Sequence, residues 1–288
     1  MIQARRLTAF AACALIAGCS AAAPAVRTTV PDPGRLLIGA AASSYRSFTA
    51  STGVAPAIVE HYASTGAAFD PSFAGPAEPM IQLEPRGVTL SSVAAGSLDG
   101  WLSRYARSVA AFGRPTVLGW APEMNGAWYS WGYRHATPAQ YIAAWRHVVA
   151  LFRADGARNV TWIWTVNVNA GGTGNASVAS PAPWWPGSDW VGMIGVDGYY
   201  YGPAQTFASL FGPTIDAVRK LGRDQVLISE TGAAPAAGQP AKIRDLFAGA
   251  RADRLLGVVY FDLPGNRDWR LRSAAALTAY RTAVREYR

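Results

Sequence analysis

Short apolar runs recur along the chain from residue 36 onward. Most are continuously apolar rather than alternating, which is typical of parallel strands that are covered on both faces. Eight such runs are present, at 36–41, 58–62, 80–83, 116–121, 159–165, 193–199, 226–229 and 258–262. They predict a sheet of eight parallel strands.

Amphipathic segments separate these runs and predict helices. Apolar residues over 101–112 fall on one helical stripe. Thr137 and Gln140 have the spacing of a capping box, with Pro138 at the first helical position. Pro213 is expected to interrupt a later helix, because proline lacks the backbone N–H that a helix interior needs. That helix and two further ones are predicted over 203–221, 240–250 and 273–285.

Strands that alternate with helices in this way predict a (β/α)8 TIM barrel of the α/β class, formed as a single domain over residues 35–288. An open doubly wound sheet is the alternative, because it is built from the same alternation. In a barrel the C-terminal ends of all eight strands surround one mouth, and catalytic residues are expected there.

The N-terminal segment has the features of an export signal. Arg5 and Arg6 precede an apolar stretch that is too short to span a bilayer. Small residues then lead to Cys19, which resembles a bacterial lipobox with the cysteine as the lipidated residue. We therefore expect a signal peptide over 1–18, an Ala/Pro/Thr-rich tether over 19–34, and an exported protein anchored to the outward membrane face. Secretion after an ordinary cut near Ala23 is the alternative.

Composition narrows the possible partners and cofactors. The formal net charge of +8 comes almost wholly from arginine and is spread along the chain, so we expect no nucleic-acid partner. His61, His135 and His147 do not form a metal-binding set, and no phosphate-binding glycine loop is present. We expect no metal, no cofactor and a monomer.

Two glutamates each follow a predicted strand and suggest acid–base chemistry on a sugar. Glu123 follows the fourth strand in a turn crowded with aromatic residues, and Glu230 closes the seventh. In a barrel both carboxylates can face one cleft, and a carboxyl pair about 5–5.5 Å apart is the geometry of a retaining glycosidase. A structural ion pair with an arginine is the alternative for Glu230.

Other residues around these strand ends are candidates for binding substrate. Trp128 and Trp131 flank the turn after Glu123 and are expected to stack on sugar rings, although such residues are often core. Asn125, in the same run, is also assigned to substrate binding. Glu84 ends the third strand and either hydrogen-bonds sugar hydroxyls or forms a salt bridge.

Several runs, in order along the chain, resemble glycoside hydrolase family 26. They are 123–132, 184–187 with 190–192, 196–199, 229–232 and 268–270. The resemblance implies a barrel glycosidase with Glu123 as acid/base and Glu230 as nucleophile. It also implies that Tyr199 donates a hydrogen bond to Glu230, and that Tyr260 and Phe261 form an aromatic floor under the cleaved sugar.

The resemblance implies a polysaccharide substrate, with β-1,4-mannan as the first expectation. A β-glucan such as lichenan and a β-1,3-xylan are alternatives on the same machinery. The family commonly has His directly before the acid and Arg four residues before it, but this chain has Pro122 and Gly119. A catalytically weak, carbohydrate-binding lipoprotein is therefore an alternative of a different class.

Overall fold

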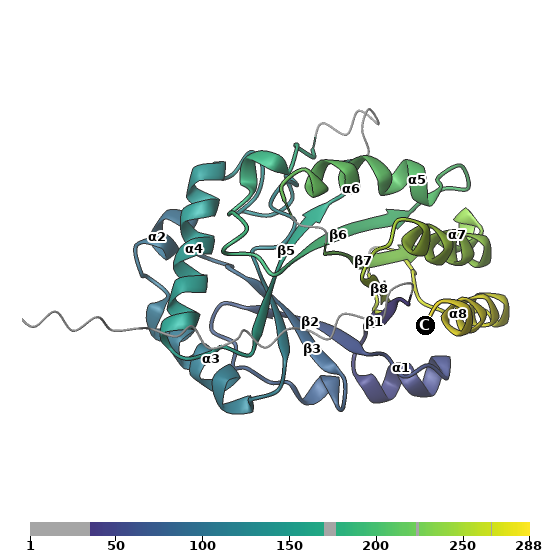
Figure 1. The fold of residues 1–288 in the computed structure, drawn as a ribbon, viewed down its shortest axis with the longest axis horizontal. Helices are drawn as coiled ribbons and strands as arrows, with labels where there is room; N and C mark the ends of the chain where they lie inside the picture. Colours follow the sequence, from purple (N-terminus) through teal and green to yellow (C-terminus); the bar gives the residue numbers. More distant parts are fainter. Residues whose placement is uncertain (1–34, 170–176, 223–224, 266) are drawn as a thin grey trace, which may run out of the picture.

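The computed structural model describes residues 35–169, 177–222, 225–265 and 267–288. Its eight strands pair in sequence order and close into a parallel barrel, so the predicted (β/α)8 fold is confirmed and the open sheet is excluded. Figure 1 shows the strands surrounded by helices. The strands are β1 Leu37–Ala41, β2 Ile58–Ser64, β3 Glu78–Glu84, β4 Thr116–Trp120, β5 Val160–Asn167, β6 Met193–Tyr200, β7 Val226–Ala233 and β8 Gly257–Phe261.

The helices follow the strands along the chain. They are α1 Tyr45–Thr52, α2 Leu90–Ala94, α3 Asp99–Phe112, α4 Pro138–Ala154, α5 Phe207–Leu210, α6 Gly212–Arg219, α7 Gln239–Ala252 and α8 Ala274–Tyr287. The predicted capping box opens α4, where Thr137 and Gln140 bond each other's backbone N–H groups. The predicted helix over 203–221 is instead two helices, α5 and α6, which meet beside Pro213.

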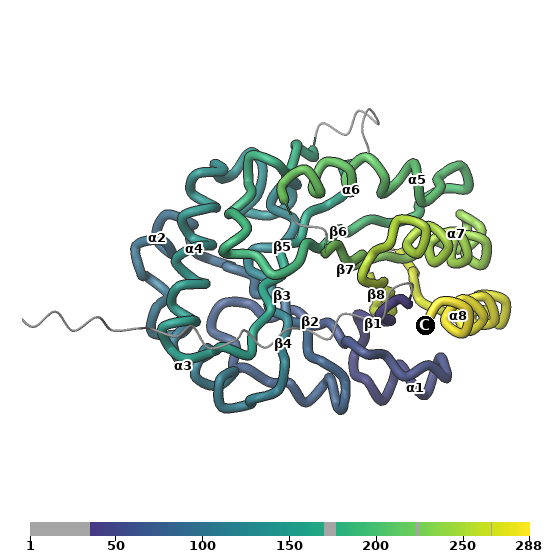
Figure 2. The backbone as a smooth tube through the Cα atoms, viewed as in Figure 1, coloured from purple at the N-terminus to yellow at the C-terminus, as the bar shows by residue number. Residues whose placement is uncertain are grey.

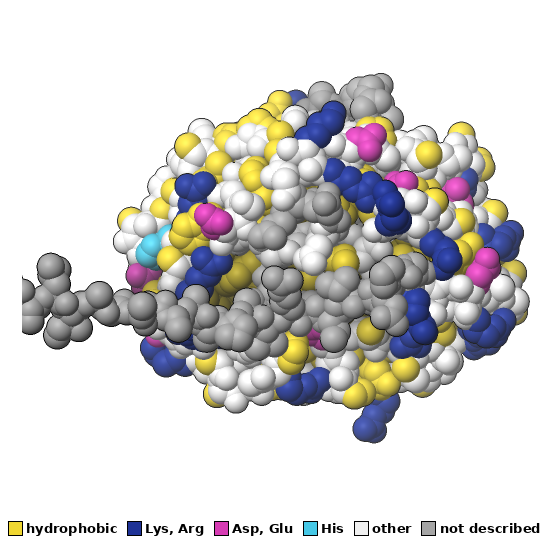
Figure 3. Space-filling view, viewed as in Figure 1, with side chains coloured by type: hydrophobic (Ala, Val, Ile, Leu, Met, Phe, Trp, Pro, Cys, Tyr) yellow, Lys and Arg dark blue, Asp and Glu magenta, His cyan; other side chains and the backbone are white. Residues whose placement is uncertain are grey.

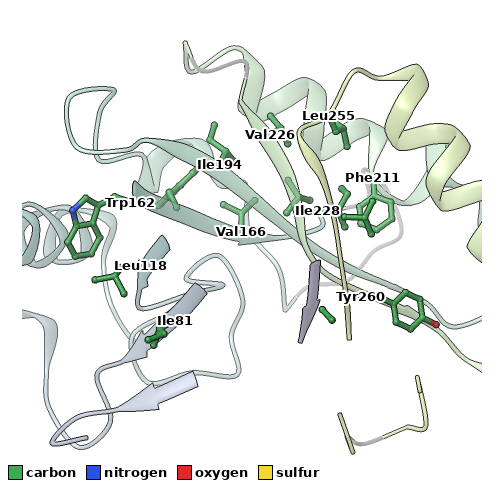
Figure 4. Close-up of a cluster of buried hydrophobic side chains, with 14 of the residues drawn as sticks. Ile81, Leu118, Trp162, Val166, Ile194, Phe211, Val226, Ile228, Leu255 and Tyr260 are labelled. Atoms are coloured by element: carbon green, nitrogen blue, oxygen red, sulfur yellow. The ribbon is translucent and has the colours of Figure 1, made fainter. Parts of the chain in front are cut away.

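The larger core lies between the barrel and its helices. Strand residues that point outward pack against the helices, among them Ile81, Leu118, Trp162, Ile194 and Val226 (Figure 4). This burial on the outer face explains why the strand sequences are apolar at positions that do not reach the barrel interior.

A second core fills the base of the barrel interior. One residue from each strand forms this layer: Ala41, Ile58, Met80, Val117, Ile163, Met193, Leu227 and Val259. All eight are buried, at 2% exposure or less. The base is therefore packed with side chains, as barrel interiors usually are.

Two residues further along β2, β3, β5 and β7 the interior becomes polar. Glu60, Gln82, Thr165 and Ser229 occupy this middle layer of the barrel interior, and all four are buried. Gln82 Nε2 donates to Glu60 Oε1 and to Thr165 Oγ1, each at 3.1 Å. Gly119 leaves room for this network, because a Cβ there would lie 1.8 Å from Gln82 Oε1.

The barrel closes where the two ends of the described chain meet. β1 pairs with β8 over five residues, and Figure 2 shows the two strands side by side. Leu36 N donates to Tyr287 O at 2.7 Å, which ties the start of the barrel to the end of α8. Cys19, the expected signal and the expected tether lie outside the described residues. None of the helices within the described residues has the length and apolar character that crossing a bilayer requires.

Candidate active site

A cleft of about 690 Å³ opens at the C-terminal ends of the strands. Its walls come from the ends of β4 to β8 and the loops that follow. Glu123, Trp128, Tyr199, Glu230 and Phe261 all line it. The structure thus brings together five of the residues that the sequence singled out.

Glu123 is fixed by an unusual backbone turn after β4. Ala121 and Glu123 both have positive φ, at 47° and 52°, on either side of Pro122. Such left-handed geometry is strained for residues other than glycine. Glu123 N donates to Thr165 O of β5 at 3.0 Å, which anchors the turn to the neighbouring strand.

Neutral donors hold the Glu123 carboxylate in place. Trp128 Nε1 donates to Glu123 Oε2 at 2.8 Å, and Asn167 Nδ2 donates to Oε1. Burial and the nearby charge of Glu230 raise the pKa of Glu123 to about 7, and the two hydrogen bonds oppose that rise. Glu123 can therefore hold a proton near neutral pH, as a general acid must.

Glu230 is presented by an irregularity in β7. Val196 pairs with Ile228, whereas Asp197 pairs with Glu230, so Ser229 is an extra residue in the strand. A bulge of this kind redirects side chains, and here it turns Glu230 toward the cleft. Tyr199 OH donates to Glu230 Oε1, and Tyr62 OH donates to Oε2. Burial raises the pKa of Glu230, and these two hydrogen bonds lower it.

Two more carboxyl groups lie buried beside this pair. Glu60, in the middle layer, has one oxygen bonded to Gln82 and the other without a partner. Asp197, at the end of β6, accepts from Ser229 Oγ at 2.6 Å. Burial, and then the charge of Glu230, raise the pKa of both groups well above the usual range. Burial thus favours the protonated form of each.

Glu84 forms an ion pair at the end of β3. Arg86 contacts both of its oxygens, with Nε at 2.8 Å and Nη2 at 2.9 Å. The Arg86 guanidinium also lies over the rings of Tyr129 and Trp131. The structure thus shows the salt-bridged arrangement for Glu84, which lies behind the cleft rather than among its lining residues.

Three residues expected to bind substrate lie behind the cleft wall instead. Trp131 is 2% exposed and donates to Pro122 O, while Asn125 is buried and bonds Asn167. Tyr260 faces the helices, because neighbouring residues of a strand point to opposite faces and Phe261 faces the cleft. Their positions correct the expectation of direct sugar contact. Asn125 instead supports Asn167, which holds Glu123.

Sequence reasoning missed Tyr62 and Asn167. Both occupy the interior position two residues beyond the middle layer, Tyr62 on β2 and Asn167 on β5. Counting in steps of two from Glu60 and Thr165 would have identified them, since alternate residues share a face. The counting requires the strand register, which apolar runs alone do not fix.

The histidines have structural partners. His61 stacks on Phe73 at 3.7 Å and contacts Ala42 O, and His147 pairs with Asp99. His135 contacts Ala127 O in the loop after β4. Within the described ranges, no group of three His, Cys, Asp or Glu side chains is placed to hold a metal ion.

Comparison with known proteins gives a consistent family. The profile of glycosyl hydrolase family 26 matches residues 99–231. Endoglucanase H of Acetivibrio thermocellus is 32% identical over 220 residues, covering 71% of this chain and 24% of the relative. A β-1,3-xylanase from Vibrio sp. is 27% identical over 197 residues, covering 60% and 39% respectively. The chain thus spans well under half the length of either curated relative.

Solved structures share the fold at low identity. An endo-β-1,4-mannanase double mutant from Cellulomonas fimi superposes with a TM-score of 0.70 at 15% identity, covering 88% of this chain and 71% of that one. A mannanase from Bacillus subtilis gives 0.62 at 14% identity, covering 86% and 85%. Both similarities extend over nearly all of the barrel.

Proposed function

The chain belongs to glycoside hydrolase family 26, and from that premise we propose that it is an endo-acting, retaining β-glycanase. The observation that carries this proposal is the pair of carboxyl groups in one cleft with different hydrogen-bond partners. Glu123 is half-buried and held by neutral donors that leave it able to carry a proton. Glu230 accepts two phenolic hydrogen bonds, which favour its ionised form.

The two roles follow from these protonation states. Glu230 attacks the anomeric carbon while Glu123 donates its proton to the glycosidic oxygen, so that a glycosyl-enzyme ester forms and the leaving chain departs. Glu123, now ionised, then deprotonates a water that attacks the same carbon and releases Glu230. Trp128 is 44% exposed beside Glu123, where its ring can stack on the departing sugar.

A β-glucan is our first candidate for the polymer, and β-mannan is the second. The curated relative that matches most of this chain is an endoglucanase. The solved mannanases are too distant in sequence to carry a specificity argument. The family's usual His and Arg beside the acid, which contact the sugar or the carboxylates, are replaced by Pro122 and Gly119.

Hydrolysis of four polysaccharides by the purified protein tests the reaction and the polymer together. We expect new reducing ends from lichenan, fewer from glucomannan and galactomannan, and least from β-1,3-xylan. Proton NMR should show the β anomer as the first product, and an initial α anomer would exclude retention. Binding to a glycan without any hydrolysis would favour the carbohydrate-binding alternative over an enzyme.

Glu230→Ala should remove hydrolysis by three orders of magnitude or more, about the loss expected when a covalent nucleophile is deleted. Ser229→Ala, one residue away and behind the cleft, is the matched control for a change in β7. Equal loss in both variants would indicate damage to the strand rather than removal of the nucleophile.

We also propose export with a lipid anchor on Cys19. The support is the apolar segment and the small residues that precede this cysteine. Growth of a bacterial expression host with labelled palmitate should label the full-length protein but leave Cys19→Ala unlabelled. Label that persists in Cys19→Ala would reject the anchor at this position.

A further inference from the structure

Tyr62 approaches the nucleophile from the far side of the barrel. It lies on β2, and its hydroxyl donates to Glu230 Oε2, while Tyr199 of β6 donates to Oε1. We propose that Tyr62 is a second positioning residue for Glu230, one that fixes the carboxylate plane and stabilises its charge with a neutral donor. The inference rests on Glu230 acting as the nucleophile.

The surroundings of Glu230 explain why a second donor matters. Glu60 lies on the same strand face as Tyr62, Asp197 pairs with Glu230 in the sheet, and Glu123 shares the cleft. Glu84, the next acid around the barrel, is bound to Arg86. Burial, and then the charge of Glu84, disfavour an ionised Glu230, whereas the hydrogen bonds from Tyr199 and Tyr62 favour it.

Both side-chain donors to Glu230 in this chain are neutral phenols. Gly119 and Pro122 stand where the family commonly has Arg and His near the carboxylates. Gln82 fills the space above Gly119 and bonds Glu60 rather than Glu230. With one phenol on each oxygen, Glu230 is held in a single orientation without a cation in contact with it among the described ion pairs.

In Tyr62→Phe, the Glu230 carboxylate should be held less firmly in one orientation, and its negative charge should be less stabilised. This variant keeps the ring and loses only the hydroxyl. We expect the pKa of Glu230 to rise by about one unit, because a hydrogen bond to the charged form is lost. The acidic limb of kcat/KM should move up by the same amount, so kcat/KM should fall by about tenfold at pH values well below that limb.

Carbon-13 NMR of labelled glutamate measures this pKa without relying on turnover. The chain has glutamate only at 60, 78, 84, 123, 230 and 286, so the signals are few. Titration in a Glu123→Gln background removes one glutamate whose titration depends on Glu230, and the signal lost in Glu230→Gln assigns the nucleophile. An unchanged or lower pKa for Glu230 in Tyr62→Phe would overturn the proposal.

Tyr105→Phe is the matched control. It deletes a buried hydroxyl on α3 that has no hydrogen-bond partner, so the Glu230 titration and the pH profile should stay as in the wild type. Absence of hydrolysis by the wild type would reject the proposed function, whereas the NMR shift would still report the Tyr62 contact. Failure of the proposed function and failure of the Tyr62 proposal would therefore give different results.

Discussion

Two glutamates with the same functional group differ here because of the donors that surround them. Glu123 accepts from an indole and an amide, and Glu230 accepts from two phenols. Burial raises the pKa of both glutamates, so their different hydrogen-bond donors determine how their protonation differs. The residues that donate these hydrogen bonds do not themselves react, but they determine which glutamate is the acid and which is the nucleophile.

The alkaline limb of activity should report Glu123. The acid must be protonated, so activity should decline as the pH rises through its pKa of about 7. Trp128→Phe keeps an aromatic ring but removes the hydrogen bond that lowers this pKa. The limb should therefore move to higher pH by about half a unit to one unit, measured as kcat/KM against pH.

Trp101→Phe is the control for the Trp128 variant, because the Trp101 indole donates to Ala67 O on the outer side of the barrel. Its pH profile should match the wild type. A limb that moves to lower pH in Trp128→Phe would contradict the assigned direction of the indole contact.

Glu60 should make stability depend on pH. Its folded-state pKa lies well above the ordinary value, so the unfolded chain loses this proton first as the pH rises. The free energy of unfolding should therefore fall from about pH 4.5 up to the folded-state pKa. Glu60→Gln removes that loss, so its free energy of unfolding should fall less between pH 5 and pH 8 than that of the wild type.

Urea unfolding of wild type and Glu60→Gln at both pH values measures this difference. Glu286→Gln, an exposed change on α8, should leave the slope with pH as it is in the wild type. A Glu60→Gln variant with an unchanged slope would mean that Glu60 is ionised in the folded protein.

Sequence identified reacting residues more readily than supporting ones. Glu123 and Glu230 stand out because glutamate is scarce and both follow apolar strands. Tyr62 and Trp131 show the limit: Tyr62 donates to Glu230 although no motif marked it, and Trp131 is a marked residue that is buried. Whether an aromatic side chain faces the cleft depends on packing across the barrel, which residue type does not encode.

At the scale of elements, β4 is matched to its neighbour β3. A Cβ at position 119 would overlap Gln82 Oε1, so Gly119→Ala should lower the free energy of unfolding by about 1–3 kcal/mol, the usual cost of overpacking. Gln82→Ala combined with Gly119→Ala removes the overlap. We expect the double variant to lose less than the sum of the two single changes, measured by urea unfolding.

If the two single variants lose unfolding free energy in amounts that add up to the loss in the double variant, then Gln82 moves aside freely and packing does not require glycine at position 119. Gly212→Ala at the start of α6 is a useful comparison, since a Cβ there meets nothing within 4 Å. Its effect on unfolding should be small.

Strands and long helices were predictable because burial on both faces and helical stripes leave strong patterns. The capping box of α4 is one example, and Pro213 correctly marked a break between helices. The short helices α1 and α2 had no such pattern. They have eight and five residues and begin at Ser44 and Thr89 caps within polar sequence, so tertiary packing decides their structure, which for α2 is packing against α4.

The whole molecule separates its charges. Arginine and lysine side chains are scattered over the visible face in Figure 3, consistent with the net charge of +8. The cleft instead contains Glu123 and Glu230, with Glu60 and Asp197 buried beneath. An anionic sugar beside an ionised Glu230 would meet like charge, so a neutral polymer fits this site better.

We therefore expect hydrolysis of neutral β-glycans but none of uronate-rich polymers such as alginate or polygalacturonate. The KM for the neutral substrate should change by less than about twofold between 0.05 and 0.5 M NaCl, because salt screens charge and not stacking. Reducing-end assays at both salt concentrations measure this. Faster cleavage of a uronate polymer would place a cation in the cleft that the described residues do not show.

The bond between Leu36 and Tyr287 has a practical consequence for handling the protein. Both ends of the described chain leave from the closed base of the barrel, opposite the mouth. A bead, a surface or a fused partner attached through either end would leave the mouth exposed to a bulky, insoluble polymer. The same proximity makes the two ends joinable by a short linker, with new ends cut elsewhere in the barrel.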